Sequence, residues 1–513
     1  MALLSIPRPL FLLSLAPHIG SSSRTRRHPC SCSLSLQQPT RRLQKSDAGS
    51  AILWFKQDLR VDDHPGLVQA AKFPSLVPLY VFDHQILSRY SDEMLELVLF
   101  ALEDLRLSLK EQGSNLMIRF GNAENVIKDL VLKVKGTDVF AEEEVEYHLR
   151  QMLDVVEETL VKTPSGTAKI VLWRTPFYDI KNLKELSSSY EEFMKLKLPV
   201  TSPVVAPTLP GANMELDWGI IPTLDELKKF VNDNPTKLKE SWSSIRDLST
   251  ESILLKKLAK SRGNNLSNKS SVPIQRKRPQ NTVFVTSKGN VVGGGTSKIL
   301  NGLAAYLRYL EGTGRDDWQE LHEKLRNAEV KEGASFLQLF GPALNLGIIS
   351  KRRVHYETIK YEKERNGGFL SPFGYSTANV AAVADAVCST EWYRLLGLKS
   401  QISDEVKYPI RIWRWNGYLI QYTVAGSEGP ATLLVHGFGA FLEHYRDNIH
   451  NISEGRNRVW AITVLGFGKS EKPNVVYTEL MWAELLRDFV IEVVGEPVHL
   501  VGNSIGGMLQ VLA

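Results

Sequence analysis

The stretches Ala51-Ile52-Leu53-Trp54-Phe55 and Leu76-Val77-Pro78-Leu79-Tyr80-Val81-Phe82 decide the fold of the first part of the chain. Both are short and apolar, which is typical of strands buried on two faces. The segments between such stretches, for example residues 91–112, carry apolar residues at three- and four-residue spacing, as amphipathic helices do. Strands that alternate with helices predict a parallel, doubly wound α/β sheet whose ligand crevice lies at the carboxyl ends of the strands. Further strands of this sheet are expected at Asn115–Phe120, Thr137–Ala141 and Lys169–Trp173.

The last hundred residues return to the strand pattern after a long helical interval. Residues 296–400 are expected to be mostly helical, residues 223–260 helical and highly charged, and residues 261–281 a polar, low-complexity linker. The later strands are expected at Pro409–Trp413, Tyr418–Val424, Ala431–Val435, Val459–Val464 and Pro497–Val501, with a helix near Thr478–Val494. The predicted organisation is a leader at 1–47, an α/β domain at 48–210, a charged linker at 211–290, a reduced helical segment at 291–404 and a second, incomplete α/β domain at 405–513.

Composition and charge limit the classes of function. The chain has 513 residues, of which 43% are hydrophobic and 23% charged, an ordinary globular composition. The net charge of +5 arises in residues 1–46, which hold seven basic and no acidic residues; the remainder has 55 basic and 57 acidic residues. The body of the chain is therefore not a polybasic nucleic-acid binder, and we do not expect DNA as a partner. No apolar run approaches the ~18 residues of a membrane helix, so no integral membrane span is expected.

The N-terminal segment predicts import into an organelle. It is rich in Ser, Arg and Leu and lacks acids, which is typical of a transit peptide. The prediction is the chloroplast first and the mitochondrion second. A secretory signal is the competing interpretation, because Leu10–Ala16 form a short apolar run, and an untargeted tail is the third. Cys30 and Cys32 lie in this segment and leave Cys388 alone, which fits a reducing compartment.

The first strand and the turn after it resemble a known family. Residues 54–65 read WFKQDLRVDDHP, and residues 76–83 read LVPLYVFD. Both resemble the start of the N-terminal α/β domain of photolyases and cryptochromes, over about residues 50–200. In that family the domain sometimes holds an antenna chromophore, but no residue is assigned to one here. A purely structural interpretation makes Trp54 and Phe55 core residues, and makes Asp58 and Arg60 a local ion pair.

The flavin domain of that family is only partly represented. Gly293–Thr296 resemble its beginning, residues 333–352 resemble the flavin-binding stretch of DASH-type cryptochromes, and residues 391–396 resemble a later helix. Positions where that family supplies hydroxyl groups to the flavin phosphates hold Leu337, Gln338 and Gly341 instead. Leu and Gly have no side-chain donor for a phosphate oxygen. We therefore expect no cofactor, with FAD or an antenna chromophore as the alternative, and no metal.

The end of the chain carries a nucleophile motif. Gly502-Asn503-Ser504-Ile505-Gly506 follows an apolar strand and precedes a helix-prone run, which is the setting of the G-x-S-x-G elbow. Such a turn holds the serine in a strained conformation and exposes its hydroxyl group, so Ser504 is the candidate nucleophile. His436-Gly437-Phe438-Gly439 follows the strand at 431–435 and resembles an oxyanion loop. The backbone N–H groups of Phe438 and Ile505 are the candidate oxyanion donors, while His436 is expected to shape the loop.

This part of the chain, about residues 408–513, resembles the plant pheophytinase-like branch of the α/β hydrolases. Residues 461–470 (AITVLGFGKS) resemble a segment of that family in which an acid usually stands at the position of Thr463. The resemblance implies a tetrapyrrole or other hydrophobic ester as substrate. In this fold the triad acid and histidine follow the serine, but the nine residues after Ser504 contain neither. We therefore expect little turnover from this chain, and expect an incomplete version of a longer protein rather than a half-domain that has lost its chemistry.

Three functions remain open from the sequence. The first is an organelle-targeted, photolyase-like protein fused to a serine hydrolase module that cleaves a hydrophobic ester. The second is a blue-light photoreceptor or DNA photolyase-like protein. The third is a non-catalytic scaffold. The sequence carries no expectation about the oligomeric state.

Overall fold

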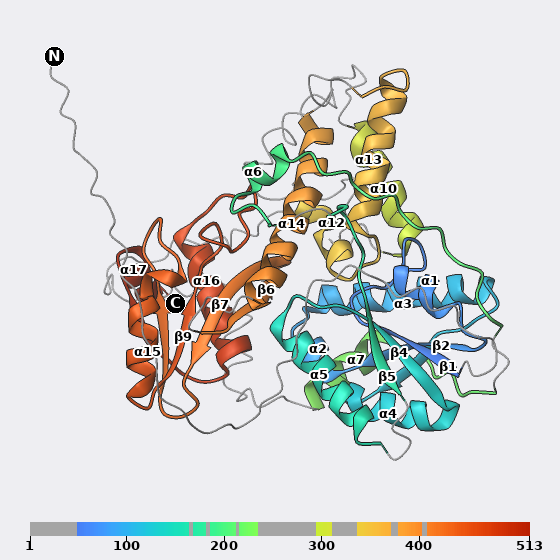
Figure 1. Cartoon of the computed structure of the whole chain (residues 1–513), viewed down its shortest axis with the longest axis horizontal. Helices are drawn as coiled ribbons and strands as arrows, with labels where there is room; N and C mark the ends of the chain where they lie inside the picture. The colour runs from blue at the N-terminus through green and yellow to red at the C-terminus, as the bar shows by residue number, and fades with distance from the viewer. Residues whose placement is uncertain are drawn as a thin grey trace, which may run out of the picture. The chain divides into compact units, whose positions relative to one another are not determined.

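The computed structural model describes residues 49–163, 168–180, 185–211, 215–233, 294–309, 336–370, 378–402 and 408–512. The leader predicted at 1–47 and the linker predicted at 261–281 lie outside these ranges. Figure 1 shows two separate β-sheets with a group of helices between them in the sequence. Within the described residues, no helix has the length and apolar character that crossing a membrane requires.

The first sheet is parallel and has the order β3-β2-β1-β4-β5. Its strands match the segments predicted from the sequence. They are β1 (Ser50–Phe55), β2 (Leu76–Phe82), β3 (Met117–Phe120), β4 (Gly136–Glu142) and β5 (Lys169–Trp173). The strand order reverses between β1 and β4, so the carboxyl ends of these two strands flank the crevice where such sheets bind ligands.

Helices cover both faces of this sheet, as a doubly wound fold requires (Figure 1). Along β1 the side chains alternate between two cores. Leu53 and Phe55 pack with α1 (Pro65–Ala70) and α3 (Asp92–Glu111). Ile52 and Trp54 pack with α4 (Ala123–Val134) and α5 (Tyr147–Val161). Trp54 is 1% exposed and Phe55 is fully buried, which confirms their prediction as core residues.

The helical interval contains the described helices α10 (Thr296–Tyr309), α12 (Phe336–Asn345), α13 (Lys351–Arg365) and α14 (Ala378–Ile402). They follow the helix α7 (Leu224–Asp233), which begins the segment predicted as charged and helical. Their apolar faces join the core on one side of the first sheet, through residues such as Phe340, Val383 and Trp392. The helical interval is therefore packed on the α/β domain and does not form a separate body.

The second sheet is mixed and has the order β10-β8-β9-β7-β6. Its strands again lie where the sequence predicts them. They are β6 (Ile410–Trp415), β7 (Tyr418–Ala425), β8 (Ala431–Val435), β9 (Arg458–Ile462) and β10 (His499–Gly502). β6 and β7 form an antiparallel hairpin, whose turn residues Asn416 and Gly417 both have positive φ angles of 47° and 91°. This is the backbone conformation that two-residue hairpin turns prefer.

The strand β10 lies at one edge of this sheet, beside β8. Two further helices frame it: α16 (Glu479–Phe489), which continues as a π-helical turn η2 (Val490–Val494), and α17 (Ile505–Leu512). Thr478 caps α16 by accepting a hydrogen bond from the N–H of Met481. With strands and helices in both parts, the two sheets have the α/β architecture predicted from the sequence.

Candidate functional site

The candidate nucleophile lies on a sharp turn between a strand and a helix. β10 ends at Gly502, α17 begins at Ile505, and Ser504 between them has a φ angle of +55°. A non-glycine residue in this left-handed region costs of order 1–2 kcal/mol and persists only where the surroundings impose it. Ser504 is exposed to solvent. The geometry is therefore that of a strained turn that presents one hydroxyl group.

Two glycines make this turn possible. A Cβ atom on Gly502 would lie 2.3 Å from the carbonyl carbon and oxygen of Gly506. A Cβ atom on Gly506 would lie 2.3 Å from the carbonyl oxygen of Val435 on β8. Both distances are shorter than any tolerable contact with backbone atoms, so the strand, the turn and the helix approach closely only because these positions lack side chains.

The two candidate oxyanion donors come from both sides of Ser504. Ile505 opens α17, so its N–H is among those that a helix leaves without an intrahelical acceptor. Phe438 lies in the turn after β8, next to Gly437, where a Cβ atom would be 3.2 Å from the Cβ atom of Ser504. The structure thus brings the turn after β8 against the elbow, although the two segments are about 65 residues apart. The catalytic roles of Ser504, Phe438 and Ile505 stay predictions.

The ring of His436 holds the turn after β8 in place. Its Nε2 accepts a hydrogen bond from the N–H of Val464 at 3.1 Å, so its Nδ1 carries the proton and donates to the carbonyl oxygen of Gly437 at 2.8 Å. His436 is 1% exposed. Burial lowers the pKa of His436, while the bond to Gly437 opposes that change. With both nitrogens engaged, the ring is a neutral structural element of the turn.

Thr463, which stands where the hydrolase pattern has an acid, supports the neighbouring loops. Its hydroxyl oxygen accepts a hydrogen bond from the N–H of Leu442 at 3.0 Å. Its carbonyl oxygen accepts one from the Ser470 hydroxyl at 2.6 Å, and that hydroxyl also accepts from the N–H of Gln421 at 2.9 Å. All of these polar groups lie in the core of the sheet, so Thr463 acts here as a structural hydroxyl.

Two other histidines of this domain contact neighbouring side chains of their own segments. His450 pairs with Glu454 one helical turn further on, at 3.0 Å, and both side chains are largely exposed. The ring of His444 packs edge-on against Tyr445. Across the described ranges, no hydrogen bond joins the Ser504 hydroxyl to a histidine or a carboxylate.

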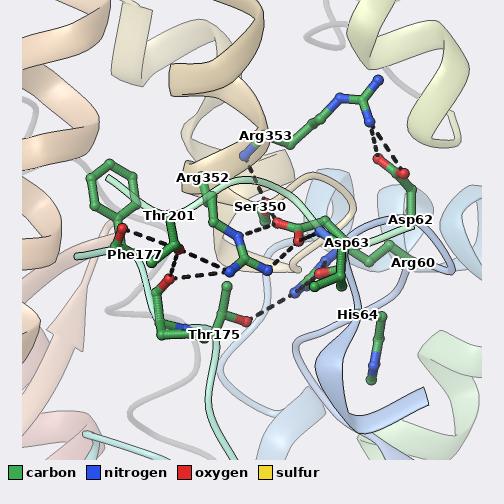
Figure 2. Close-up of polar contacts among 12 residues, drawn as sticks. Arg60, Asp62, Asp63, His64, Thr175, Phe177, Thr201, Ser350, Arg352 and Arg353 are labelled. Atoms are coloured by element: carbon green, nitrogen blue, oxygen red, sulfur yellow. Dashed lines mark hydrogen bonds and ion pairs between the residues drawn. The ribbon is translucent and has the colours of Figure 1, made fainter. Parts of the chain in front are cut away.

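A second polar cluster occupies the turn after β1 (Figure 2). Asp63 is fully buried and its carboxylate accepts hydrogen bonds from the guanidinium of Arg352, the hydroxyl of Ser350 and the N–H of Val204. Arg352 also donates to the carbonyl oxygen of Pro176 at 3.1 Å and to the hydroxyl of Thr201 at 3.0 Å. Figure 2 shows Arg352 between Asp63 of this turn and Thr201. The cluster therefore ties the helical interval to the first sheet.

The expectation that Asp58 and Arg60 form a local ion pair is wrong. Asp58 accepts hydrogen bonds from His64 at 3.0 Å and from the backbone N–H of Lys56 at 2.7 Å. Arg60 turns to the carbonyl oxygens of Asp63 and of Gly347. The buried turn has unpaired backbone carbonyl groups, and a guanidinium with five donors satisfies several of them at once, whereas Asp58 finds a closer donor in His64.

Charged residues that the sequence analysis did not single out flank the crevice between β1 and β4. The ammonium group of Lys56, which is 2% exposed, lies 3.2 Å from the carboxylate of Glu144 and 3.3 Å from the carbonyl oxygen of Glu142. Burial and the nearby charge of Asp58 raise the pKa of Glu142 to about 8. The signal for this group was in the sequence, because Glu142-Glu143-Glu144 stands directly at the end of an apolar strand.

The two sheets define the class: a chain that joins a doubly wound photolyase-type α/β domain to an α/β hydrolase domain. Comparison with known proteins shows the same division. Residues 51–194 match the family model for DNA photolyase, and residues 432–513 match the model for the α/β hydrolase family. The two matches do not overlap: the first contains nearly the whole first sheet, and the second contains β9, β10 and nearly all of β8 of the second sheet.

Individual relatives resemble the first part. The cryptochrome DASH, chloroplastic/mitochondrial, of Solanum lycopersicum is 24% identical over 353 residues, which cover 63% of this chain and 51% of that protein. The blue-light photoreceptor PHR2 of Arabidopsis thaliana is 27% identical over 270 residues, covering 48% of this chain and 59% of that protein. The crystal structure of a Synechocystis cryptochrome is similar at 18% identity and a TM-score of 0.45, covering 70% of this chain and 63% of the other. The chain spans about half the length of the curated relatives it matches.

The expectation that no cofactor is needed is wrong for this class. Residues 51–194 match the family model for DNA photolyase, and the similar curated proteins include cryptochromes DASH. Photolyases and cryptochromes bind FAD, so FAD is the expected cofactor for a chain of this class. The crystal structure of an archaeal photolyase from Sulfolobus tokodaii with two FAD molecules resembles this chain at 16% identity and a TM-score of 0.40, covering 70% of this chain and 64% of the other. The expectation rested on missing hydroxyl groups in one stretch, and the domain match outweighs that local argument.

The described residues of the helical interval do not by themselves fit a flavin. The hydroxyl of Thr296 donates to the carbonyl oxygen of Ile348 at 2.9 Å, and Ser350 and Arg352 are both bound to Asp63. The rings of Phe336 and Phe340 stack at 5.1 Å and belong to the buried core. The polar groups described here are thus engaged with protein partners, and we derive no step through a flavin.

Proposed function

We propose that this protein is a chloroplast serine hydrolase module joined to a photolyase-like domain, in which Ser504 attacks the carbonyl carbon of a hydrophobic ester. The observation that carries the proposal is the conformation of Ser504, held at a φ angle of +55° between Gly502 and Gly506. A turn of this kind costs stability, and a catalytic hydroxyl is the established use of such a strained serine.

The chemistry follows from what surrounds the serine. As the Ser504 oxygen bonds to the ester carbon, negative charge develops on the carbonyl oxygen, and the N–H groups of Phe438 and Ile505 are in the two segments that would receive it. The serine proton must pass to a base, and His436 does not serve because both of its nitrogens are engaged. We therefore keep the prediction that this 513-residue chain turns over slowly.

Apolar side chains near the elbow favour a hydrophobic substrate. Phe438, in the turn that lies against Ser504, is 77% exposed and packs edge-on against Phe467 at 5.5 Å. An aromatic ring left in solvent beside the nucleophile is a surface that an apolar acyl or alcohol group would cover.

The test is labelling of the full chain by a fluorophosphonate probe, with added imidazole as an external base. We expect labelling that rises with imidazole concentration and disappears in Ser504→Ala. Ser453→Ala is the matched control, because its hydroxyl only donates to the carbonyl oxygen of His450 within one helix. No labelling at any imidazole concentration, or equal labelling of Ser504→Ala, would remove the hydrolase proposal and leave a non-catalytic scaffold.

The organelle is proposed from the leader and from the names of relatives. Two plant relatives are named as chloroplastic/mitochondrial proteins, and residues 1–47 have the composition of a transit peptide. Fusing these residues to a fluorescent protein and locating it in leaf cells tests the proposal. Fluorescence in the chloroplast is expected, and fluorescence in the mitochondrion or cytosol contradicts it.

The photolyase match favours a second candidate function, blue-light reception with FAD as the expected cofactor. The test is the absorbance spectrum of the purified full chain, followed by release of the bound pigment and its identification by mass spectrometry. A stoichiometric flavin supports this candidate, and a colourless protein that does not take up added FAD contradicts it. This outcome is independent of labelling at Ser504.

A further inference from the structure

A cavity of about 280 Å³ lies where the α/β domain meets the hydrolase domain, and its described lining includes neither Ser504 nor the charged residues Lys56, Glu142 and Glu144 of the crevice between β1 and β4. Four lining residues come from the first domain: Arg89 and three residues of the first turns of α5. Seven come from the second domain, on β6, β7, β9 and η2. Because residues of both domains line it, the cavity exists only where the two are joined.

The charge around this cavity is predominantly positive. Arg89 and Arg411 line it, and Glu492 is the one carboxylate among the described lining residues. That carboxylate already accepts a hydrogen bond from the indole N–H of Trp413 at 3.1 Å. His148 lies in the same wall, and its pKa is lowered well below the ordinary value by burial and then by the charges of Arg89 and Arg414. Burial therefore favours the neutral form of this histidine, which leaves two arginines and one carboxylate as the charged groups of the wall.

One arginine donor in the wall has nothing to bind. The guanidinium of Arg411 lies 3.8 Å from the ring centre of Tyr147, which fixes its position by a cation–π contact. Its Nε–H is buried and lacks a hydrogen-bond acceptor in the described part of the chain. A buried donor without an acceptor costs about 1–3 kcal/mol, so an acceptor placed in the cavity would remove that cost.

Aromatic side chains make up much of the remaining wall. Tyr147, Trp413, Tyr422 and Trp460 all line the cavity. Such rings offer flat, polarisable surfaces for another ring, while the arginines offer charge-assisted hydrogen bonds to an anionic group. A volume of about 280 Å³ is just below the range of pockets for drug-sized ligands, which limits the occupant to one ring and its substituent.

We propose that this cavity binds a small aromatic anion, a single ring that bears a carboxylate or a phosphate group. The anionic group lies against Arg89 and Arg411, and the ring lies among the aromatic side chains. The ligand would contact both domains at once, and it would stabilise the contact between them. This proposal does not depend on hydrolysis at Ser504 or on a flavin.

The experiment titrates the full chain with benzoate and with phenyl phosphate, the two anionic probes, and with benzamide as the neutral isostere of benzoate. The intrinsic fluorescence reports binding because two tryptophans line the cavity. We expect a dissociation constant of about 1 mM or below for at least one anion, and at least tenfold weaker binding of benzamide. Whichever anion binds more tightly identifies the head group as carboxylate or phosphate.

Two variants and one control locate the site. Arg411→Gln and Arg89→Gln should each weaken binding of the preferred anion at least tenfold. Arg446→Gln, an arginine whose side chain is 66% exposed on the hydrolase domain, should leave it unchanged. Circular dichroism and the melting temperature establish that each variant folds. If one of the two arginine variants does not fold, the binding measured with the other one decides. Equal binding of benzoate and benzamide, unchanged affinity in the folded arginine variants, or no binding of either anion up to 10 mM, roughly ten times the expected constant, would overturn the proposal.

Discussion

Replacing Asp63 with alanine tests how strongly the helical interval is tied to the first sheet. The Asp63 carboxylate is fully buried, and its partner Arg352 is 2% exposed. The substitution removes the acceptor for two arginine nitrogens, for the hydroxyl of Ser350 and for the N–H of Val204. The guanidinium stays in place, held by Pro176 and Thr201. The result is a buried positive charge without a counter-ion.

The expected magnitude follows from that burial. Breaking a buried ion pair by removing one partner costs about 3–5 kcal/mol, because the remaining charge is desolvated and uncompensated. Against a total unfolding free energy of about 5–15 kcal/mol, this is a large fraction of the stability. Removing the stranded charge as well, in Asp63→Ala with Arg352→Met, should recover part of the loss, because an apolar side chain of similar length is cheaper to bury.

Urea denaturation of the full chain, followed by far-ultraviolet circular dichroism, measures these differences. The adjacent Asp62→Ala is the matched control: Asp62 pairs with Arg353 at 3.1 Å, but the side chain of Asp62 is 32% exposed and that of Arg353 is 26% exposed. An ion pair that is partly open to solvent contributes roughly 0–1 kcal/mol. The reasoning fails if Asp63→Ala costs no more than Asp62→Ala, or if the double variant is less stable than Asp63→Ala alone.

Three further predictions concern the elbow and the crevice. Gly506→Ala should destabilise the hydrolase domain by about 1–3 kcal/mol or more in thermal unfolding, because the new Cβ atom meets the carbonyl oxygen of Val435, whereas Gly341→Ala, where the Cβ atom would be in open space, should be neutral or stabilising. Without added base, the 513-residue chain should show little or no esterase activity above background, so Ser504→Ala should leave the measured rate unaltered; a sharp fall would reveal a base that the described contacts do not show. The pKa of Glu142 is raised to about 8 in the folded protein, from 4.5. The stability that comes from protonating Glu142 is therefore fully present below about pH 4.5 and is lost as the pH rises through 8. The unfolding free energy should fall across that range by up to a few kcal/mol, and Glu142→Gln should flatten the decline.

The strands and the elbow were predictable because their constraints are local in the sequence. A run such as AILWF is buried on both faces of a parallel strand, and that requirement shows in five consecutive residues. The elbow likewise needs Gly502 and Gly506 on either side of Ser504, because each glycine avoids a backbone contact within the motif or with the adjacent strand. These features can be found without knowing what lies far away in the chain.

The polar ties were not predictable for the opposite reason. Asp63 and Arg352 are 289 residues apart, and nothing in either neighbourhood indicates the other. The same holds for Asp58. Its position near Arg60 in the sequence suggested an ion pair between the two, whereas the folded turn places His64 beside Asp58. Local charge patterns predict pairs on a helix surface but not in a buried turn, where backbone carbonyl groups compete for the arginine.

The contact between the two domains follows from both kinds of constraint. Arg414 on β6 reaches Glu146, which is 1% exposed at the start of α5, and Ile412 and Leu419 of the hydrolase domain share an apolar core with Val145 and Leu396. A buried ion pair inside a shared core resists separation, because pulling the domains apart would expose apolar surface and leave both charges to be rehydrated in new surroundings. The first domain and the β6–β7 hairpin of the second sheet therefore share one core, and substitutions in the first domain that disturb α5 should change the melting of the second.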